Sequence, residues 1–151
     1  MDVWELTARE EIRELVARYA HFADSGRFDE MVALFAEDGV LEIVDREELH
    51  GRQAIHDFLV ATATRFRASS APRSIRHHVT SLRIEVSAPG EATSASYFLV
   101  VGEHGPDHWG RYRDRYTHRD GGRWLFARRQ VRVDGRAPSS AIAHRDDRLK
   151  S

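Results

Sequence analysis

His78 is the first candidate for chemistry, because an imidazole has a pKa near neutrality and can both take up and release a proton. It lies in the segment Arg76–Val86, whose even positions are mostly apolar. Side chains alternate between the two faces of a strand, so this pattern predicts that His78 shares the apolar face while His77 points to the other side. A β-bulge would reverse that register. The alternative is a core histidine that bonds to the backbone.

Asp24 and Tyr19 come from the other end of the chain and could complete a proton-transfer site. Asp24 follows two apolar residues near the end of the first predicted helix, where a carboxylate opposes the helix dipole. It forms either a solvated turn or a carboxylate that tips into a cavity and orients His78. Tyr19 lies on the apolar stripe of the same helix, where its hydroxyl could donate to a ligand carbonyl or the ring could simply pack in the core.

The segment His108–His118 alternates between two kinds of residue. Its polar and aromatic positions are predicted to face inward, and its arginines are predicted to face solvent or another subunit. With a net charge of −1, the chain is not expected to bind nucleic acid through that arginine row. Aromatic residues of this strand and of the helices are expected to line a substrate cavity: Phe22, Phe35, Phe58, Tyr112 and Tyr116.

The histidine spacings do not match a metal-ligand set. No pair of histidines four residues apart falls on a predicted helix, and neighbouring histidines on a strand point to opposite faces. The chain has no cysteine, which excludes disulfides, thiolate catalysis and Cys-ligated zinc. It contains no Gly-rich phosphate loop and no GxSxG or HExxH motif. We therefore expect no metal and no cofactor.

Helical periodicity dominates the first part of the chain. The sequence Thr7–Glu10 is a capping box that predicts the start of a helix, and Ser25-Gly26 predicts its end. The other helices, the strand among them and the turns beside it are predicted at these positions: helices Phe28–Phe35 and Gly51–Arg67, strand Val40–Val44, and turns Glu37–Gly39 and 45–50.

Period-two patterns follow in the second part. After a loop at Ser69–Arg73, four long strands are predicted, with turns at Pro89-Gly90 and Asp120–Gly122: Ile75–Val86, Thr93–Val101, His108–His118 and Arg123–Val133. Helices followed by a strand meander predict an α+β fold, a cone-shaped, curved antiparallel sheet packed against the N-terminal helices. Such a cone leaves an open mouth suited to a small apolar ligand.

Length and composition bound the class of protein. A chain of 151 residues with 41% hydrophobic residues predicts one folded domain, which we place at 1–135, with an arm or disordered tail at 136–151. No apolar run is long enough for a membrane span, and the N-terminal sequence lacks the features of a signal peptide. A cytoplasmic protein without a membrane partner is the expectation.

Four segments resemble the SnoaL-like proteins of the nuclear-transport-factor-two-like superfamily. They are Thr7–Leu15, Tyr19–Asp29, Leu34–Val40 and Asp120–Phe126, and the resemblance extends over about residues 4–133. It implies the α+β cone fold. It implies an activity less closely, because this superfamily hosts many functions.

One branch of this superfamily contains scytalone dehydratase, bile-acid dehydratase and hexachlorocyclohexane dehydrochlorinase, which use an Asp–His pair. By resemblance that pair falls on Asp24 and His78, with His77 one position away, a further tyrosine falls on Tyr19, and a second histidine falls near His108. The acids of the steroid-isomerase-like members have no match here.

The residues and the resemblance together predict a cofactor-independent lyase or isomerase of the dehydratase type. His78, held by Asp24, would take a proton from a small, largely apolar, cyclic substrate, and Tyr19 and His108 would assist. The alternatives are a module of the same fold that binds a small molecule or a partner without turnover, and a polyketide cyclase. A homodimer or homotrimer is expected.

Overall fold

The computed structural model describes residues 1–68, 74–119, 122–140 and 142. The predicted loop Ser69–Arg73, most of the predicted turn Asp120–Gly122 and residues 141 and 143–151 of the predicted tail lie outside these ranges. Three helices and six strands are described: α1 (Val3–Ser25), α2 (Phe28–Val32), β1 (Phe35–Ile43), β2 (Glu47–His50), α3 (Arg52–Ala68), β3 (Ile75–Ala88), β4 (Glu91–Gly102), β5 (Gly105–His118) and β6 (Trp124–Arg136).

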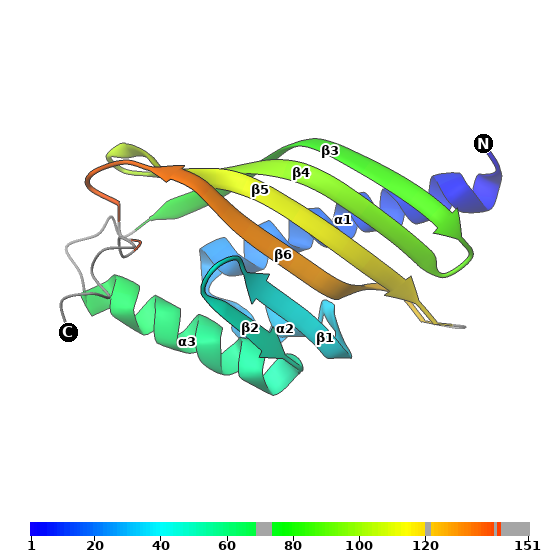
Figure 1. Cartoon of the computed structure of the whole chain (residues 1–151), viewed down its shortest axis with the longest axis horizontal. Coiled ribbons are helices and arrows are strands. Elements are labelled where there is room, and N and C mark those ends of the chain that lie inside the picture. Colours follow the sequence, from blue (N-terminus) through cyan, green and yellow to red (C-terminus); the bar gives the residue numbers. More distant parts are fainter. Residues whose placement is uncertain (69–73, 120–121, 141, 143–151) are drawn as a thin grey trace.

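The six strands form one sheet in the order β2-β1-β6-β5-β4-β3. All neighbours are antiparallel except β1 and β6, which run parallel. The long strands curve over α1, while α3 lies beside the short strands at the other side of the molecule (Figure 1). The predicted α+β cone is thus confirmed, with helices held against one face of a bent sheet.

The apolar stripe of α1 forms the centre of the core, as its periodicity predicts. Ile12, Leu15, Val16 and Tyr19 are buried, since they repeat at the helical spacing and face the sheet. Gly26 ends this helix in the left-handed conformation with φ 69°, and its amide and the next one return to carbonyls of the last turn.

Two predicted boundary signals in the first part of the chain, a helix cap and a turn, have other roles in the structure. The helix α1 begins at Val3, so the predicted capping box is wrong: the Thr7 hydroxyl instead donates to the Val3 carbonyl one turn earlier, at 3.0 Å. The predicted turn Glu37–Gly39 is an irregularity inside β1, where the pairing with β6 shifts between Phe35 and Val40. Strand pairing continues across it because Gly39 has no Cβ, which would lie 2.9 Å from the Ala36 carbonyl.

The boundaries of two further elements differ from prediction. The second helix is shorter than expected, since Phe35 already belongs to β1 and pairs with Phe126 of β6. The segment 45–50 is not all turn, because Glu47–His50 forms the edge strand β2 against β1.

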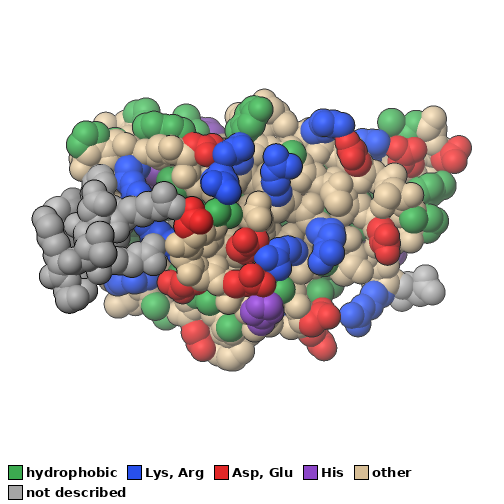
Figure 2. All heavy atoms as spheres, viewed as in Figure 1, with side chains coloured by type: hydrophobic (Ala, Val, Ile, Leu, Met, Phe, Trp, Pro, Cys, Tyr) green, Lys and Arg blue, Asp and Glu red, His purple; other side chains and the backbone are tan. Residues whose placement is uncertain are grey.

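The outward face of β5 carries the predicted arginine row. Arg111 pairs with Asp134 on β6, with N–O distances of 2.9 and 3.0 Å, and Arg113 and Arg115 are exposed. Figure 2 shows basic and acidic side chains interspersed over the face that it presents. No helix among the described residues is long and apolar enough to cross a membrane.

Candidate active site

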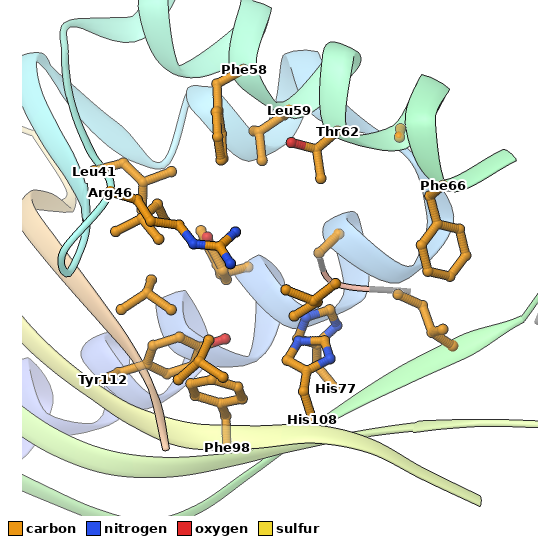
Figure 3. A pocket seen from close by; sticks show the side chains of 18 of the residues that line it. Leu41, Arg46, Phe58, Leu59, Thr62, Phe66, His77, Phe98, His108 and Tyr112 are labelled. Atoms are coloured by element: carbon orange, nitrogen blue, oxygen red, sulfur yellow. The ribbon is translucent and has the colours of Figure 1, made fainter. Parts of the chain in front are cut away.

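A cavity of about 1110 Å³ opens between the end of α1, the helix α3 and the curved sheet. Figure 3 shows side chains from α3 and from the strands facing one another across it. More of its lining is apolar than polar, and titratable groups also reach it, among them Asp24, His77, His108 and Arg46. Among the apolar residues that line it are Met31, Leu41, Leu59, Phe66, Phe98 and Val131.

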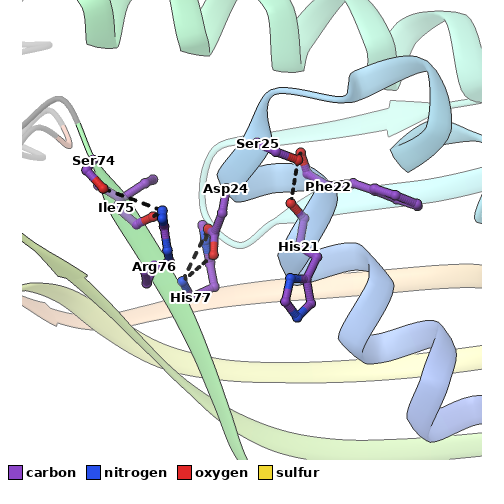
Figure 4. Close-up of polar contacts among 8 residues, drawn as sticks. All are labelled: His21, Phe22, Asp24, Ser25, Ser74, Ile75, Arg76 and His77. Carbon is purple, nitrogen blue, oxygen red and sulfur yellow. Dashed lines mark hydrogen bonds and ion pairs between the residues drawn. The ribbon is translucent and has the colours of Figure 1, made fainter.

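Asp24 and His77 meet at the wall of this cavity. The Nδ1 atom of His77 lies 2.6 Å from Oδ1 of Asp24, and the backbone N–H of His77 donates to the same carboxylate, at 3.1 and 3.2 Å to its two oxygens (Figure 4). The side chains are only 12% and 17% exposed, for Asp24 and His77 respectively. A carboxylate that accepts from Nδ1–H fixes the tautomer of the ring and leaves Nε2 as the proton acceptor.

The expected orientation of His78 is wrong, because His78 is exposed and lies on the outer face of β3. The cause is a β-bulge at Ser81, which has φ 54° and interrupts the pairing with β4 between Thr80 and Arg83. Before the bulge the odd positions point inward, and after it the even positions do. The apolar even positions therefore predicted the wrong face for the histidine that precedes the bulge.

His108, near which the resemblance places a second histidine, lines the cavity. Its Nδ1 atom is 2.7 Å from Oδ2 of Asp107, and its ring packs against that of Phe98 with centroids 5.9 Å apart. Burial lowers the pKa of His108, and His77 and Arg136 also lower it, whereas Asp107 raises it. The lowered pKa favours a neutral imidazole near pH 7.

Tyr19 and Tyr112 line the cavity together and are almost fully buried. Their rings meet edge to face, with centroids 6.3 Å apart. Burial raises the pKa of both hydroxyls, so both tyrosines are protonated at neutral pH and can donate a hydrogen bond. The charge of Asp24 also raises the pKa of Tyr112, which indicates that this tyrosine lies in the field of the Asp24–His77 pair.

A buried ion pair that the sequence patterns do not predict supports the two tyrosines. Arg129 of β6 and Asp114 of β5 have no solvent exposure and share two N–O contacts of 2.9 Å. The Arg129 guanidinium lies over the rings of Tyr19, Tyr112 and Phe126, at 4.2, 3.9 and 4.5 Å from their centroids. The pair thus fixes the rings behind the cavity wall.

Two of the five predicted lining aromatics, Phe58 and Tyr112, line the cavity, and three do not. Phe35 is fully buried against Phe126, with ring centroids 5.2 Å apart. Tyr116 is sealed in the core, where its hydroxyl lies 2.7 Å from that of Ser94. Phe22 packs against the core, and the Arg27 guanidinium lies 4.9 Å from its ring centroid. These corrections share one cause: an inward-facing aromatic at helical or strand spacing is as well placed to fill the core as to face a ligand.

Several residues that line the cavity were not predicted. The spacing of the apolar ones on a helix or strand is equally typical of core residues. Leu59 and Phe66 lie on α3 about two helical turns apart, and Phe98 lies on the buried face of β4. Ser140 and Ile142 also reach the cavity from the segment that the sequence predicted as a tail. Among the described residues, no three His, Asp or Glu side chains converge as metal ligands.

Three solved structures illustrate what this fold resembles. A candidate scytalone dehydratase from Novosphingobium aromaticivorans is 23% identical, with a TM-score of 0.77 over 93% of this chain and 91% of that one. A nuclear-transport-factor-two-like protein with a cystatin-like fold from the same organism is 28% identical, with a TM-score of 0.76 over 91% and 89%. The protein LinA is 17% identical, with a TM-score of 0.77 over 93% of this chain and 96% of that one.

No curated protein matches this chain. The family model of the SnoaL-like domain matches residues 4–130, which is most of the sequence. The matched range contains both Asp24 and His77. The family that the residues resemble is therefore confirmed: the chain belongs to the SnoaL-like domain family.

Proposed function

We propose that this protein is a cofactor-independent lyase or isomerase of the dehydratase type, and that Asp24 and His77 form its catalytic pair. The observation that supports this most directly is the 2.6 Å contact between Nδ1 of His77 and Asp24 at the wall of a mostly apolar cavity. A carboxylate-bound imidazole beside an apolar cavity is suited to take a proton from carbon, because the carboxylate stabilises the imidazolium that forms.

The reaction begins at the Nε2 atom of His77, on the side of the ring opposite Asp24. This atom takes a proton from a carbon next to a carbonyl, and the electron pair of that C–H bond moves toward the carbonyl oxygen. A hydroxyl of Tyr19 or Tyr112 stabilises the developing oxyanion by donating a hydrogen bond. In a dehydratase, a neighbouring hydroxyl then leaves as water with the returned proton. In an isomerase, the proton returns at another carbon. His108 assists the second proton transfer.

The substrate that fits is small, largely apolar and cyclic. Phe58, Phe66 and Phe98 present flat apolar surfaces from two sides of the cavity, and its volume of about 1110 Å³ leaves room for a molecule of one or a few rings. The fold supports the proposed dehydratase chemistry, since one of the similar structures is that of a candidate scytalone dehydratase.

A second function of another class uses the same cavity without turnover. In that case the cone binds a small molecule or a partner, and the Asp24–His77 contact serves to tie the end of α1 to β3. A polyketide cyclase would share the proton abstraction but form a carbon–carbon bond in the next step. The expected homodimer or homotrimer stays a prediction. The exposed aromatic side chains of Tyr97 and Trp109 on the outer sheet face, 57% and 40% exposed, are apolar surface that a second subunit would cover.

Deuterium exchange tests proton abstraction before the natural substrate is identified. A panel of cyclic ketones, enones and β-hydroxy ketones in D₂O is incubated with the protein, and deuterium incorporation at carbon and loss of water are followed by mass spectrometry. We expect the wild-type protein to accelerate one or both for at least one panel member. His77→Ala is expected to reduce that rate by about 10²–10⁴-fold, the range for a lost general base.

His78→Ala is the matched control, because His78 is the neighbouring residue of the same strand and is exposed. It should leave the rate unchanged, while Asp24→Asn should lower it. Near-normal rates in both the His77 and Asp24 variants would exclude this pair as the catalytic group. Panel members that bind the wild-type protein in a thermal-shift assay without any exchange or water loss would favour the binding module instead.

A further inference from the structure

Asp107 is a buried carboxyl group that the Asp24–His77 pair does not involve. Its side chain is 1% exposed. Its Oδ2 atom accepts from the Ser140 hydroxyl at 2.7 Å and lies 2.7 Å from Nδ1 of His108. Its Oδ1 atom lies 3.2 Å from Nε2 of His104, and its backbone carbonyl accepts from the Ala137 amide at 2.7 Å. Two imidazoles and a hydroxyl thus contact one carboxylate. Burying a carboxylate without such partners would cost much free energy.

The contact with Asp107 decides which edge of His108 is available. A carboxylate accepts and does not donate, so Nδ1 of His108 carries the proton, and Nε2 on the other edge of the ring is left with a lone pair. His108 lines the cavity with His77, and Figure 3 shows the two rings at the same wall. The charges that act on His108 come from Asp107 beside it, His77 of β3 and Arg136 of β6.

We propose that Asp107 is a positioning residue, which holds His108 so that its Nε2 atom meets a ligand in the cavity as a proton acceptor. The cavity then contains two carboxylate–imidazole pairs, Asp24–His77 and Asp107–His108. In the resting protein His108 is an acceptor, and it becomes an acid only after it has taken up a proton. The kinetic consequence rests on the proposed function, whereas the tautomer of His108 is a property of the free protein.

The tautomer is measured directly in the full chain. Long-range ¹H–¹⁵N correlation spectra distinguish a protonated from an unprotonated ring nitrogen, and His108→Gln identifies the His108 signals. In the wild-type protein at pH 7.5 we expect Nδ1 of His108 to be protonated and Nε2 to be bare. A wild-type ring that is protonated at Nε2 and bare at Nδ1 overturns the proposal without any substitution at Asp107.

Asp107→Asn removes the charge while it keeps the shape of the side chain. Because Asp107 raises the pKa of His108 against the effect of burial, the midpoint of the His108 titration should move to lower pH in this variant. The preference for the Nδ1–H tautomer should also weaken, and Asp107→Glu should restore part of both. An Asp107→Asn protein that folds, as judged by circular dichroism, and keeps the wild-type midpoint and tautomer contradicts the proposal.

Ser140→Ala separates positioning from simple anchoring. It removes the hydrogen bond that the hydroxyl donates to Asp107 and the one that it accepts from the Ile142 amide, and it changes neither Asp107 nor His108. We expect this variant to keep the wild-type tautomer of His108. If it shifts the tautomer as much as Asp107→Asn does, Asp107 acts only by holding the chain around Ser140, and the proposal fails.

The kinetic arm uses whichever panel member the wild-type protein turns over. Asp107→Asn should lower kcat by tenfold or more and change KM little, and it should displace the pH profile of kcat in the direction of the His108 midpoint. An unchanged kcat and profile overturns the catalytic part of the inference. If instead the tautomer behaves as expected but His77→Ala loses no activity, the proposed function fails while the positioning of His108 stands.

Discussion

Arg129 and Asp114 form an ion pair without solvent exposure, and removing one partner measures how firmly it holds the wall behind the cavity. The two N–O contacts are 2.9 Å, and Asp114 otherwise has the hydroxyls of Tyr116 and Ser94, at 3.1 and 3.4 Å. Arg129→Met leaves the carboxyl group buried without its cation, a change that costs about 3–5 kcal/mol. We expect the free energy of unfolding to fall by this amount, and Tm to fall by roughly 6–20 °C for a domain of this size.

Arg128→Met is the control, since Arg128 is the neighbouring residue but lies on the surface. It pairs with Glu42 and Glu48 and is 31% exposed, so its ion pairs contribute no more than about 1 kcal/mol. Both variants are unfolded with urea at one fixed protein concentration and followed by far-ultraviolet circular dichroism, with a check that the slope m is unchanged.

The double variant Arg129→Met with Asp114→Leu tests the reason for the loss. If the cost comes from an unpaired buried carboxyl group, replacing that group with an apolar side chain should recover most of it, because Ser94 and Tyr116 still bond to each other at 2.7 Å. A loss in Arg129→Met no larger than that in Arg128→Met would refute the reasoning, since the buried pair would then behave like a surface pair.

Two further predictions concern stability. The pKa of His108 is lowered in the folded protein, so between that pKa and about 6.5 the unfolded chain holds a proton that the folded protein does not. The free energy of unfolding should therefore fall as the pH drops through this window, by at most about 1.4 kcal/mol per pH unit. His108→Gln should remove this pH-dependent component in urea titrations at several pH values. Gly26→Ala should destabilise the protein by about 1 kcal/mol in the same assay, because Gly26 has φ 69° and nothing lies within 4 Å of an added Cβ, so only backbone strain acts. An unchanged urea midpoint of unfolding would exclude that strain.

The elements of this fold could be predicted because their signals are local. Helical spacing identified the buried stripe of α1, and Pro89-Gly90 identified the turn between β3 and β4, where Gly90 has φ 87°. Asp24 was found because it follows that stripe at the end of the helix. The distinction between core and cavity was not local, so Tyr116 and Tyr112 received the same prediction although only Tyr112 lines the cavity.

Two of the errors at the site, the wrong histidine and the missed ion pair, have the same physical origin. Ser81 adds one residue to β3 opposite β4, and Ala127 adds one to β6 between Phe126, which pairs with Tyr116, and Arg128, which pairs with Arg115. A strand changes its inward face at each such residue, so strict alternation fails beyond it. The first bulge turns His77 toward Asp24, and the second places Arg129 opposite Asp114. These two bulges bring His77 and Arg129 inward, whereas strict alternation without them would place the neighbouring residues His78 and Arg128 on the inner face.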